Sequence, residues 1–536
     1  MRFILIIASF LSLLVSLPPS AHALLSSANV PLDSPAYNYL DKLAGMGLLE
    51  SDIKGLKPFS KAEVARLTQE AERNLAGSNV KDNAFANELL KRLKELYPRE
   101  LQLYSAPNKA RLFDITPVTS GRLRYAWLDG TPRDYNRTVH DPGHQSAFGF
   151  IGGDLRPFSG TSKTSGSEGT PLLENNEGVV YRRGNSGELR LSGEGYIAQY
   201  ATVAIEPIIL ATGDKADVTL QKAYLKIGGG GTELEIGRDA NWFGPGYRGT
   251  TILTNNARNF DQIKLSSPEP LDVAWIKKYI GDVKYSLLLS RFDETGSGKT
   301  LRHPYLLGAK LAVKPKAWYE IGLNFVRQFG GPGFSGNPSL AESIFGGGDN
   351  DHANTIAGID MRFRIPALRN MEFYGEFSGE DNAGGIWPIV ESYVAGIYLP
   401  CITSSCRDDL RFEFFWGSEM LYGDWQFPNG YVYHGLTPGH SQGTAAQDYF
   451  VRYGHWFNPR SNISAEYSYT ERGQIGRMPG QSLEHKHAGR ISWKTPLNRV
   501  LDAELRYGIE KIINPNLQQA PDRTNQLFLM DLSYLY

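Results

Sequence analysis

Polar and apolar positions follow two different periods along this chain, and the period changes near residue 110. Between about residues 30 and 100, apolar residues recur at the spacing of a helix. From about residue 110 to the end they alternate with polar residues, as in a strand with two unlike faces. The pattern predicts a short helical region followed by a long all-β region.

The helical region carries the start and stop signals of three short amphipathic helices. Ser34 before Pro35 is typical of an N-cap followed by proline at the first helical position. Ser60 and Glu63 form a capping box, and Pro98 is expected to follow the end of the third helix. The three helices form a small bundle or pack against a larger body. The pattern is loosely similar to cell-wall-binding helical repeats, and a purely structural appendage is the alternative.

The last strand, residues 527–536, is amphipathic to its final residue. Phe528 and Tyr536 belong to its apolar face, and Asp531 and Ser533 to the other. This ending resembles the C-terminal signal of bacterial outer-membrane β-barrels, in which the last strand closes the barrel. The alternative is the edge strand of a soluble sheet.

Short and long connections alternate along the β region. Short turns are expected at residues 314–316, 366–369, 458–460 and 496–498, and long polar stretches near 330–352, 425–446, 471–483 and 511–523. Membrane barrels have this asymmetry of short periplasmic turns and long external loops. At roughly 24 residues per strand and connection, the region predicts an all-β transmembrane barrel of about 18 antiparallel strands.

The polar faces of the strands carry opposite charges on either side of the short turns. Arg362 and Arg364 precede one turn, and Glu372 and Glu376 follow it. Antiparallel pairing sets such charges opposite one another. We therefore expect a lumen crossed by ion pairs, which is stiff and does not form a wide selective pore. The alternative is the wet face of an ordinary sheet.

The N-terminus reads as a secretory signal peptide, residues 1–23, with cleavage expected after Ala23. No later segment offers about 20 unbroken apolar residues, so helical membrane spans are not expected. Cys401 and Cys406 can form a disulfide in a secreted protein. The net charge of −1 argues against nucleic acid as a partner.

The least generic segment begins at Glu235. It contains Gly237, Arg238, Trp242, Gly244, Pro245, Gly246, Asn255, Asn256 and Arg258. This order of residues resembles the Wzi family of capsule assembly proteins, as do the opening helices with Gly47-Leu48-Leu49 and the aromatic last strand. Two interpretations of the segment stay open. It contacts sugar, or it is a structural plug in which a lumen carboxylate holds Arg238 and the glycines permit a tight fold.

The resemblance implies a fold, a location and a function. It implies a periplasmic helical bundle at residues 24–105 and an outer-membrane β-barrel with long external loops at residues 106–536. It implies a lectin without catalytic activity that binds capsular polysaccharide and helps to anchor it at the cell surface. Outer-membrane lipid and other polysaccharide export components are the further partners expected.

Aromatic residues in the long loops are the candidates for sugar contacts, because flat rings stack on the C–H faces of sugars. The candidates are Trp387, Trp425, Phe427, Tyr431, Tyr433 and His434. The alternative for each is a membrane-interface girdle or loop packing.

Two other classes of function stay open. A porin or sugar-uptake channel would give large conductance in planar bilayers. An outer-membrane hydrolase would turn over lipid or glycan, with a Ser/His/Asp set assembled from distant strands. His485 and His487 share one strand face, but no further metal ligand can be placed, so we expect no metal and no cofactor.

Overall fold

The computed structural model describes residues 25–78, 83–141, 160–213, 215–229, 231–296, 301–331, 353–383, 387–424 and 426–535. The predicted signal peptide lies outside these residues. The helices are α2 (Pro35–Gly45), α3 (Lys61–Ala76), α4 (Ala84–Leu96), α5 (Pro98–Tyr104) and α7 (Ala274–Tyr279), with 3-10 turns η1 (Pro107–Lys109), η4 (Pro366–Leu368) and η5 (Pro515–Leu517).

The strands fall into a barrel and two smaller pairings. The barrel strands are β2 (Phe113–Asp129), β5 (Gly184–Ile197), β6 (Ala201–Thr212), β7 (Lys215–Gly229), β8 (Thr232–Asp239), β10 (Phe260–Ser266), β11 (Asp282–Arg291), β12 (Tyr305–Lys316), β13 (Tyr319–Phe329), β14 (Ala353–Ile365), β15 (Met371–Ala383), β16 (Trp387–Leu399), β17 (Asp408–Gly417), β18 (Ala446–Asn458), β19 (Ser461–Arg472), β20 (Glu484–Pro496), β21 (Leu501–Ile513) and β22 (Arg523–Leu535). The pairs outside it are β1 (Leu56–Lys57) with β9 (Trp242–Phe243), and β3 (Asp134–Asp141) with β4 (Gly160–Ser167).

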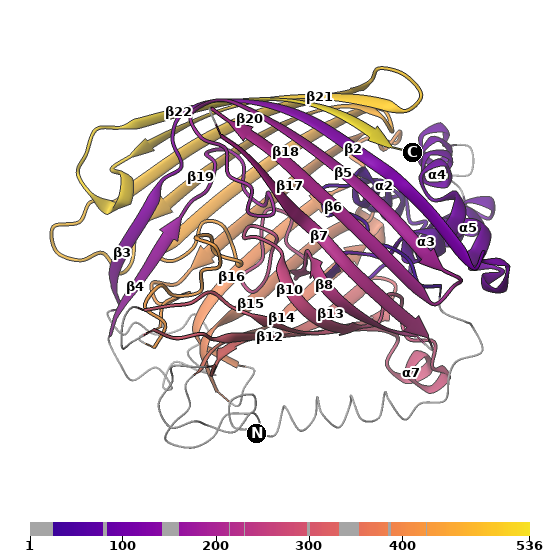
Figure 1. The fold of residues 1–536 in the computed structure, drawn as a ribbon, viewed down its shortest axis with the longest axis horizontal. Helices are drawn as coiled ribbons and strands as arrows, with labels where there is room; N and C mark the ends of the chain where they lie inside the picture. The colour runs from indigo at the N-terminus through magenta and orange to yellow at the C-terminus, as the bar shows by residue number, and fades with distance from the viewer. Residues whose placement is uncertain are drawn as a thin grey trace.

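The 18 strands form a closed antiparallel barrel, as the sequence predicted (Figure 1). Neighbours in sequence pair in turn, and the last strand, β22, pairs with the first, β2, from Ser120↔Leu535 to Asp129↔Gln526. Arg124 on β2 forms a bidentate ion pair with Asp531 on β22, with both contacts at 2.6 Å. The amphipathic last strand therefore closes the ring with its polar face inward.

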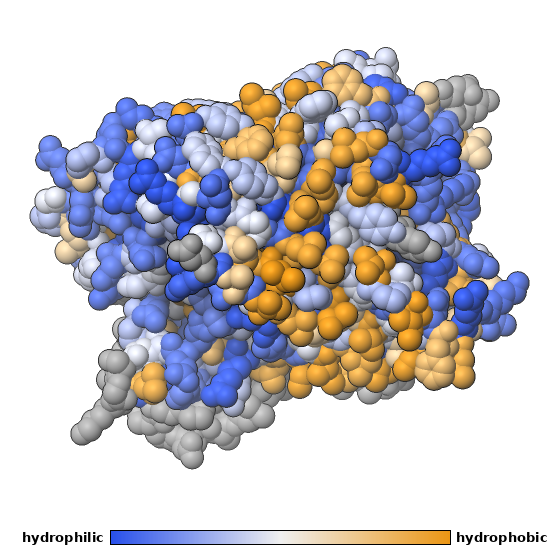
Figure 2. Space-filling view, turned by 45° about the horizontal axis from the view of Figure 1, so that its top comes forward, coloured by the Kyte–Doolittle hydropathy of each residue, from blue (hydrophilic) through white to orange (hydrophobic). Residues whose placement is uncertain are grey.

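The outer wall of the barrel is apolar. Exposed residues of this surface include Leu123, Ile205, Ile236, Ile263, Ile491 and Tyr507. Figure 2 shows the apolar surface across the wall, with hydrophilic surface toward the two ends. Exposed aromatic residues mark both rims, with Tyr449 at one end and Trp318, Phe457 and Trp493 at the other. This is the surface that a membrane barrel presents to lipid and its two interfaces.

The helices lie against the end of the barrel that carries the short turns (Figure 1). Tyr39 on α2 donates a hydrogen bond to the carbonyl of Pro459 at 2.7 Å, and Lys42 lies 2.9 Å from the Asp409 carboxylate. The core of the bundle includes Trp456 of β18 and the disulfide-bonded pair Cys401 and Cys406. The predicted disulfide is confirmed, and the helices pack on the barrel itself.

The predicted caps and the end of the third helix before Pro98 are confirmed, but the fourth helix was not predicted. The Ser34 side chain accepts from the amide of Ala36, and the Ser60 side chain from the amide of Glu63. Pro98 does more than follow the third helix, because it occupies the first turn of a fourth helix, α5. Proline is tolerated there since that position needs no amide donor. Among the described residues, no helix is long and apolar enough to cross a membrane.

Three segments that we call the plug fill the barrel: residues 49–60, 168–183 and 240–259. The first comes from the helical end, and its strand β1 pairs with β9 of the third. Glu174 of the second lies 2.7 Å from Arg490 on the wall, and Arg248 of the third lies 2.7 Å from Asp448. A cavity beside Glu174 and another beside Lys57 hold only about 30 Å³ each, which suits ordered water.

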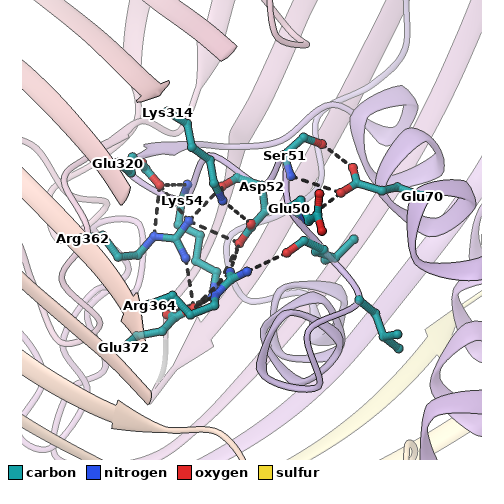
Figure 3. Close-up of polar contacts among 12 residues, drawn as sticks. Glu50, Ser51, Asp52, Lys54, Glu70, Lys314, Glu320, Arg362, Arg364 and Glu372 are labelled. Atoms are coloured by element: carbon teal, nitrogen blue, oxygen red, sulfur yellow. Dashed lines mark hydrogen bonds and ion pairs between the residues drawn. The ribbon is translucent and has the colours of Figure 1, made fainter. Parts of the chain in front are cut away.

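Asp52 is the centre of the contact between the first plug segment and the wall (Figure 3). Its carboxylate lies 2.5 Å from Lys314, 2.8 Å from Arg364 and 3.3 Å from Arg362. Burial alone raises the pKa of Asp52, but the three cations outweigh it and hold that pKa well below its usual value. One carboxylate of the plug thus balances three cations on two wall strands, β12 and β14.

The predicted ion pairs across the lumen are confirmed, with one difference. Arg362 and Arg364 pair with Glu372 at 2.9 and 3.3 Å. Glu376 makes no such pair, because the register sets Asp360 opposite it. It accepts instead from Ser378 at 2.6 Å and from the amide of Thr251 in the plug at 3.1 Å.

Replacement of Asp52 by Asn should destabilise the protein strongly, because it leaves three buried cations short of one anion. We expect the free energy of unfolding to fall by about 3–5 kcal/mol, measured by urea titration in lipid vesicles. Asp522→Asn is the matched control, since that carboxylate is 43% exposed in a surface pair with Lys511, and should change stability by about 0.5 kcal/mol or less. Equal effects of the two changes would contradict a central role for Asp52.

The raised pKa of Glu269, at the helical end, leads us to expect that the stability of the protein depends on pH. Burial and the neighbouring carboxylate of Glu63 raise the pKa of Glu269 to about 7, whereas an unfolded chain titrates near about 4.3. Between these values the folded state binds more proton, so stability falls as pH rises from about 4.3 to 7. Glu269→Gln should therefore raise the thermal midpoint at pH 8 and leave it nearly unchanged at pH 4. A gain of the same size at both pH values would refute this assignment.

Candidate functional site

The end of the barrel opposite the helices carries the long loops, and their described parts fold over its mouth. We call residues 418–445 the mouth loop. The β3–β4 hairpin lies against it, because Ser165 donates to the carbonyl of Asn429 at 3.4 Å and Ser167 to that of Gly435 at 2.6 Å. The mouth loop also contacts the plug, since Thr254 donates its amide hydrogen to the carbonyl of Pro438 at 2.6 Å. The mouth, the hairpin and the plug therefore form one connected body.

A cavity of about 260 Å³ opens between the hairpin, the mouth loop and the ends of β11 and β13. Its lining consists of Ser165, Gly166, Phe292, Asp293, Glu294, Thr295, Gln328, Asn429, Gly430, Val432 and Gly435. The set combines hydroxyl, amide and carboxylate groups with one aromatic ring. These are the groups that bond sugar hydroxyls and cover sugar C–H faces, so the cavity is the candidate functional site.

Packed aromatic rings form one wall of the cavity and lie beneath it. Phe292 stacks on Tyr431 with ring centroids 5.6 Å apart and planes 7° apart. Tyr433 lies 5.5 Å from Phe292 and 4.6 Å from Phe260. The Tyr431 hydroxyl donates to the carbonyl of Ile252 in the plug at 3.1 Å. The plug thus supports the aromatic wall from below.

The structure places the six predicted aromatic candidates in different surroundings. Phe427, Tyr431 and Tyr433 are buried in the core below the cavity, at 0%, 1% and 5% exposure. Their rings are covered, so stacking on sugar would require this loop to open, and that role stays a prediction. The His434 side chain is 48% exposed, with Nε2 3.9 Å from Asp293 at the cavity. Trp387 begins β16, and its side chain and Trp425 lie outside the described residues.

The predicted family motif links the plug to the mouth. Trp242 pairs with Lys57 in the β1–β9 pairing and is 6% exposed. Asn256 donates to the carbonyl of Thr437 at 3.0 Å, and Asn255 accepts through its carbonyl from the amide of Glu177 at 2.8 Å. Gly237 has φ of +134°, and a Cβ there would lie 2.2 Å from the carbonyl oxygen of Ala223.

The turn of the motif is equally tight. A Cβ on Gly244 would lie 2.7 Å from Thr250, and one on Gly246 would lie 1.9 Å from the carbonyl oxygen of Gly249. A side chain on Gly178 would collide with the backbone of Arg258. The motif around Pro245 is therefore tightly packed, and its structural role stays a prediction.

Arg238 is the exception within the motif, because no lumen carboxylate holds it. It pairs with Asp261 at 2.6 Å, and the Asp261 side chain is 64% exposed on the outer face. Strand β8 continues to Asp239, so alternation turns Glu235 inward and Arg238 outward with Ile236. The expectation of a lumen partner was wrong by one strand position.

The site's own polar residues were missing from the sequence-based candidates. Asp293 and Glu294 come one residue after the end of β11 at the long-loop end, and Gln328 is the second-last residue of β13. Carboxylates and amides at that end of a strand are the signal that the sequence offers for them. Among the described residues, no group of three or more His, Cys, Asp or Glu side chains is placed to hold a metal ion.

One further ring in the mouth loop, His440, is a packing residue. It is fully buried and stacks on Phe415 with centroids 3.7 Å apart. Burial lowers the pKa of His440 to about 3, so the imidazole is neutral at any physiological pH. Its Nδ1 accepts from the amide of Gln442 at 3.3 Å, which leaves it no role as a base.

The comparisons with known proteins point in one direction. The family model of capsule assembly protein Wzi matches residues 155–527. An uncharacterized 55.8 kDa protein in the cps region of Klebsiella pneumoniae is 26% identical over 175 residues, which are 31% of this chain and 33% of that protein. The match therefore spans about a third of the length of that relative.

A solved structure shares the whole fold. Wzi of Escherichia coli, described as an outer-membrane protein involved in group 1 capsule assembly and as a carbohydrate-binding β-barrel, aligns with 96% of this chain. The alignment covers 100% of that protein with a TM-score of 0.64 and 16% sequence identity. The likeness shows that the two chains share the barrel.

Tyr431→Ala and His434→Ala should differ in their effect on stability, because the Tyr431 ring is buried and the His434 ring is half-exposed. Loss of the buried ring leaves a cavity under Phe292, and we expect the free energy of unfolding to fall by about 3–5 kcal/mol. His434→Ala removes a half-exposed ring and should cost about 0.5 kcal/mol or less. Urea titration in lipid vesicles measures both. A small effect of Tyr431→Ala would show that this loop is not held closed by its aromatic contacts.

Proposed function

We propose that this chain, which belongs to the Wzi family of capsule assembly proteins, binds surface polysaccharide at its long-loop end and helps to hold capsule at the cell. The proposal rests on membership of this family and on the cavity whose lining includes Phe292. Carbohydrate binding by the E. coli protein of the same fold supports it.

The filled lumen is the observation that carries the proposal. Plug segments cross the barrel and pair with its wall, for example through Asp52 and Arg248. A barrel whose lumen is filled by its own chain presents surfaces at its ends and gives no open path for sugar uptake. This favours a binding protein over a porin.

Charge pairing also argues for binding without catalysis. Among the lumen carboxylates, Glu372 is engaged with Arg362, Arg364 and Lys54. The polar groups of the cavity surround an opening on the mouth, where a polymer has access. The hydrolase hypothesis finds no comparable support among the described residues.

The proposed placement is the bacterial outer membrane, with the long loops outside and helices α2–α5 in the periplasm after removal of residues 1–23. The apolar wall and the aromatic rims support the membrane placement. Helix α7, at the helical end, adds the exposed rings of Trp275 and Tyr279 beside Lys277 and Lys278. Aromatic and basic residues in that combination suit the lipid headgroup region. The helical end is then available to other polysaccharide export components.

Binding of polysaccharide to the purified protein tests the proposal. Asn429 is exposed at the cavity, and Asn429→Ala should weaken binding about tenfold if one hydrogen bond of about 1.4 kcal/mol is lost. Asn108→Ala is the matched control, because Asn108 is an exposed asparagine in η1 at the opposite end. Surface plasmon resonance with polysaccharide purified from the native host measures both. Equal binding by the two variants would move the site away from this cavity.

Conductance in planar bilayers tests the channel alternative. We expect no large, stable openings from the native barrel, because the plug occupies the lumen. Openings comparable to those of a general porin would contradict the proposed function and favour uptake. Deletion of the gene followed by measurement of cell-attached and shed polysaccharide then tests the anchoring role in cells.

A further inference from the structure

The cavity at the mouth has an unusual balance of hydrogen-bonding groups. Its described lining contains the carboxylates of Asp293 and Glu294 and contains no lysine or arginine. The Asp293 side chain is 33% exposed and that of Glu294 is 60% exposed, so both remain accessible to a ligand. Ionised carboxylates only accept hydrogen bonds. A ligand that satisfies them has to donate.

A third acceptor belongs to the same wall. Gln328 is 2% exposed, and its Oε1 atom has no hydrogen-bond partner. Buried polar atoms in folded proteins are nearly always paired, so an unpaired acceptor at the edge of a cavity indicates a missing donor. The unpaired Gln328 oxygen is independent of the two carboxylates, and it also requires a ligand that donates a hydrogen bond.

The nearby histidines do not reverse the charge of the cavity. His303 Nδ1 lies 2.9 Å from Glu294, and His434 Nε2 lies 3.9 Å from Asp293. Neither ring belongs to the described lining of the cavity. The site then carries two negative charges close together at its opening.

We propose that this cavity receives an uncharged or amino-bearing sugar unit of the polysaccharide and rejects uronic acids. The inference rests on the proposed function and adds the chemical class of the unit bound. Sugar hydroxyls and ammonium groups donate to the three acceptors. A uronate carboxylate offers acceptors only and places a third negative charge beside Asp293 and Glu294.

The size of the cavity fits a short unit of a longer polymer. Pockets for drug-sized ligands measure roughly 300–1,000 Å³, and this cavity holds about 260 Å³. Phe292 belongs to the lining but is only 4% exposed, so its ring closes the wall of the cavity. The rest of the polymer would lie across the mouth and outside the cavity, so its charged units would not contact Asp293 and Glu294.

The walls of the cavity are fixed before a ligand arrives. Asp293 accepts from the amide of His434, and Thr295 accepts through its hydroxyl from the amide of Asn429 at 3.4 Å. The acceptors are therefore already in position. An Asp293→Asn change keeps an oxygen that accepts from His434, so charge can be removed without loss of the wall.

Competition with short oligosaccharides of defined charge tests the inference in the full-length protein at pH 8. The probes are uncharged gluco-oligosaccharides, oligomers of glucosamine and oligomers of glucuronic acid. Glucuronic acid oligomers should bind at least about tenfold more weakly than uncharged ones, because each of the two carboxylates, at about 5 Å from a uronate, weakens binding about fourfold at the dielectric constant of water. Glucosamine oligomers should bind at least as well as the uncharged probes.

The double variant Asp293→Asn with Glu294→Gln should narrow the gap between uncharged and acidic probes to about threefold or less. Its control is Glu72→Gln with Glu95→Gln on α3 and α4, which makes the same change in net charge at the opposite end and should leave the gap unchanged. Glucuronic acid oligomers that bind the native protein as well as uncharged ones would overturn the inference and leave the proposed function standing. Failure of every probe and of native polysaccharide to bind would overturn both.

Discussion

A charged side chain that faces the inside of this barrel has to find an opposite charge there, and most of the architecture follows from that requirement. Desolvation of an ion costs several kcal/mol unless a partner compensates. The wall strands do not balance one another completely, because Lys314, Arg362 and Arg364 also pair with an anion from inside the barrel. The plug supplies what is missing, with Asp52 among three cations and Arg248 beside Asp448.

The plug that meets this requirement occupies the lumen and also supports the mouth loop. The plug is bonded to the wall, and it also contacts the mouth loop. Tyr431 of the loop bonds Ile252 of the plug, and Asn256 of the plug bonds Thr437 of the loop. The aromatic wall of the cavity stands on a body that reaches the helical end through the β1–β9 pairing. Buried ion pairs of this kind add little net stability, but they fix one arrangement of the segments that they join.

The fold could be predicted in large part because strand alternation is a local signal. The amphipathic last strand, the short turns and the caps at Ser34 and Ser60 each depend on a few adjacent residues. The structure has them, except that the turn expected at residues 314–316 lies at 317–318, because β12 continues to Lys316. Contacts between distant segments were harder. The fate of Arg238 depended on where β8 ends, and the burial of Tyr431 depended on a plug whose path no sequence pattern shows. The cavity itself unites residues from β4, β11, β13 and the mouth loop, so its acceptors could not be brought together from spacing alone.

The walls of the cavity are joined chiefly through main-chain atoms. Ser165 and Ser167 meet the carbonyls of Asn429 and Gly435, and Tyr433 bonds the carbonyl of Leu436 at 2.8 Å. Side chains at the opening can therefore be exchanged while the shape of the opening persists. Architecture and ligand preference are therefore separable in such a protein. A few point substitutions at the opening can change which polysaccharide it prefers while the fold stays the same.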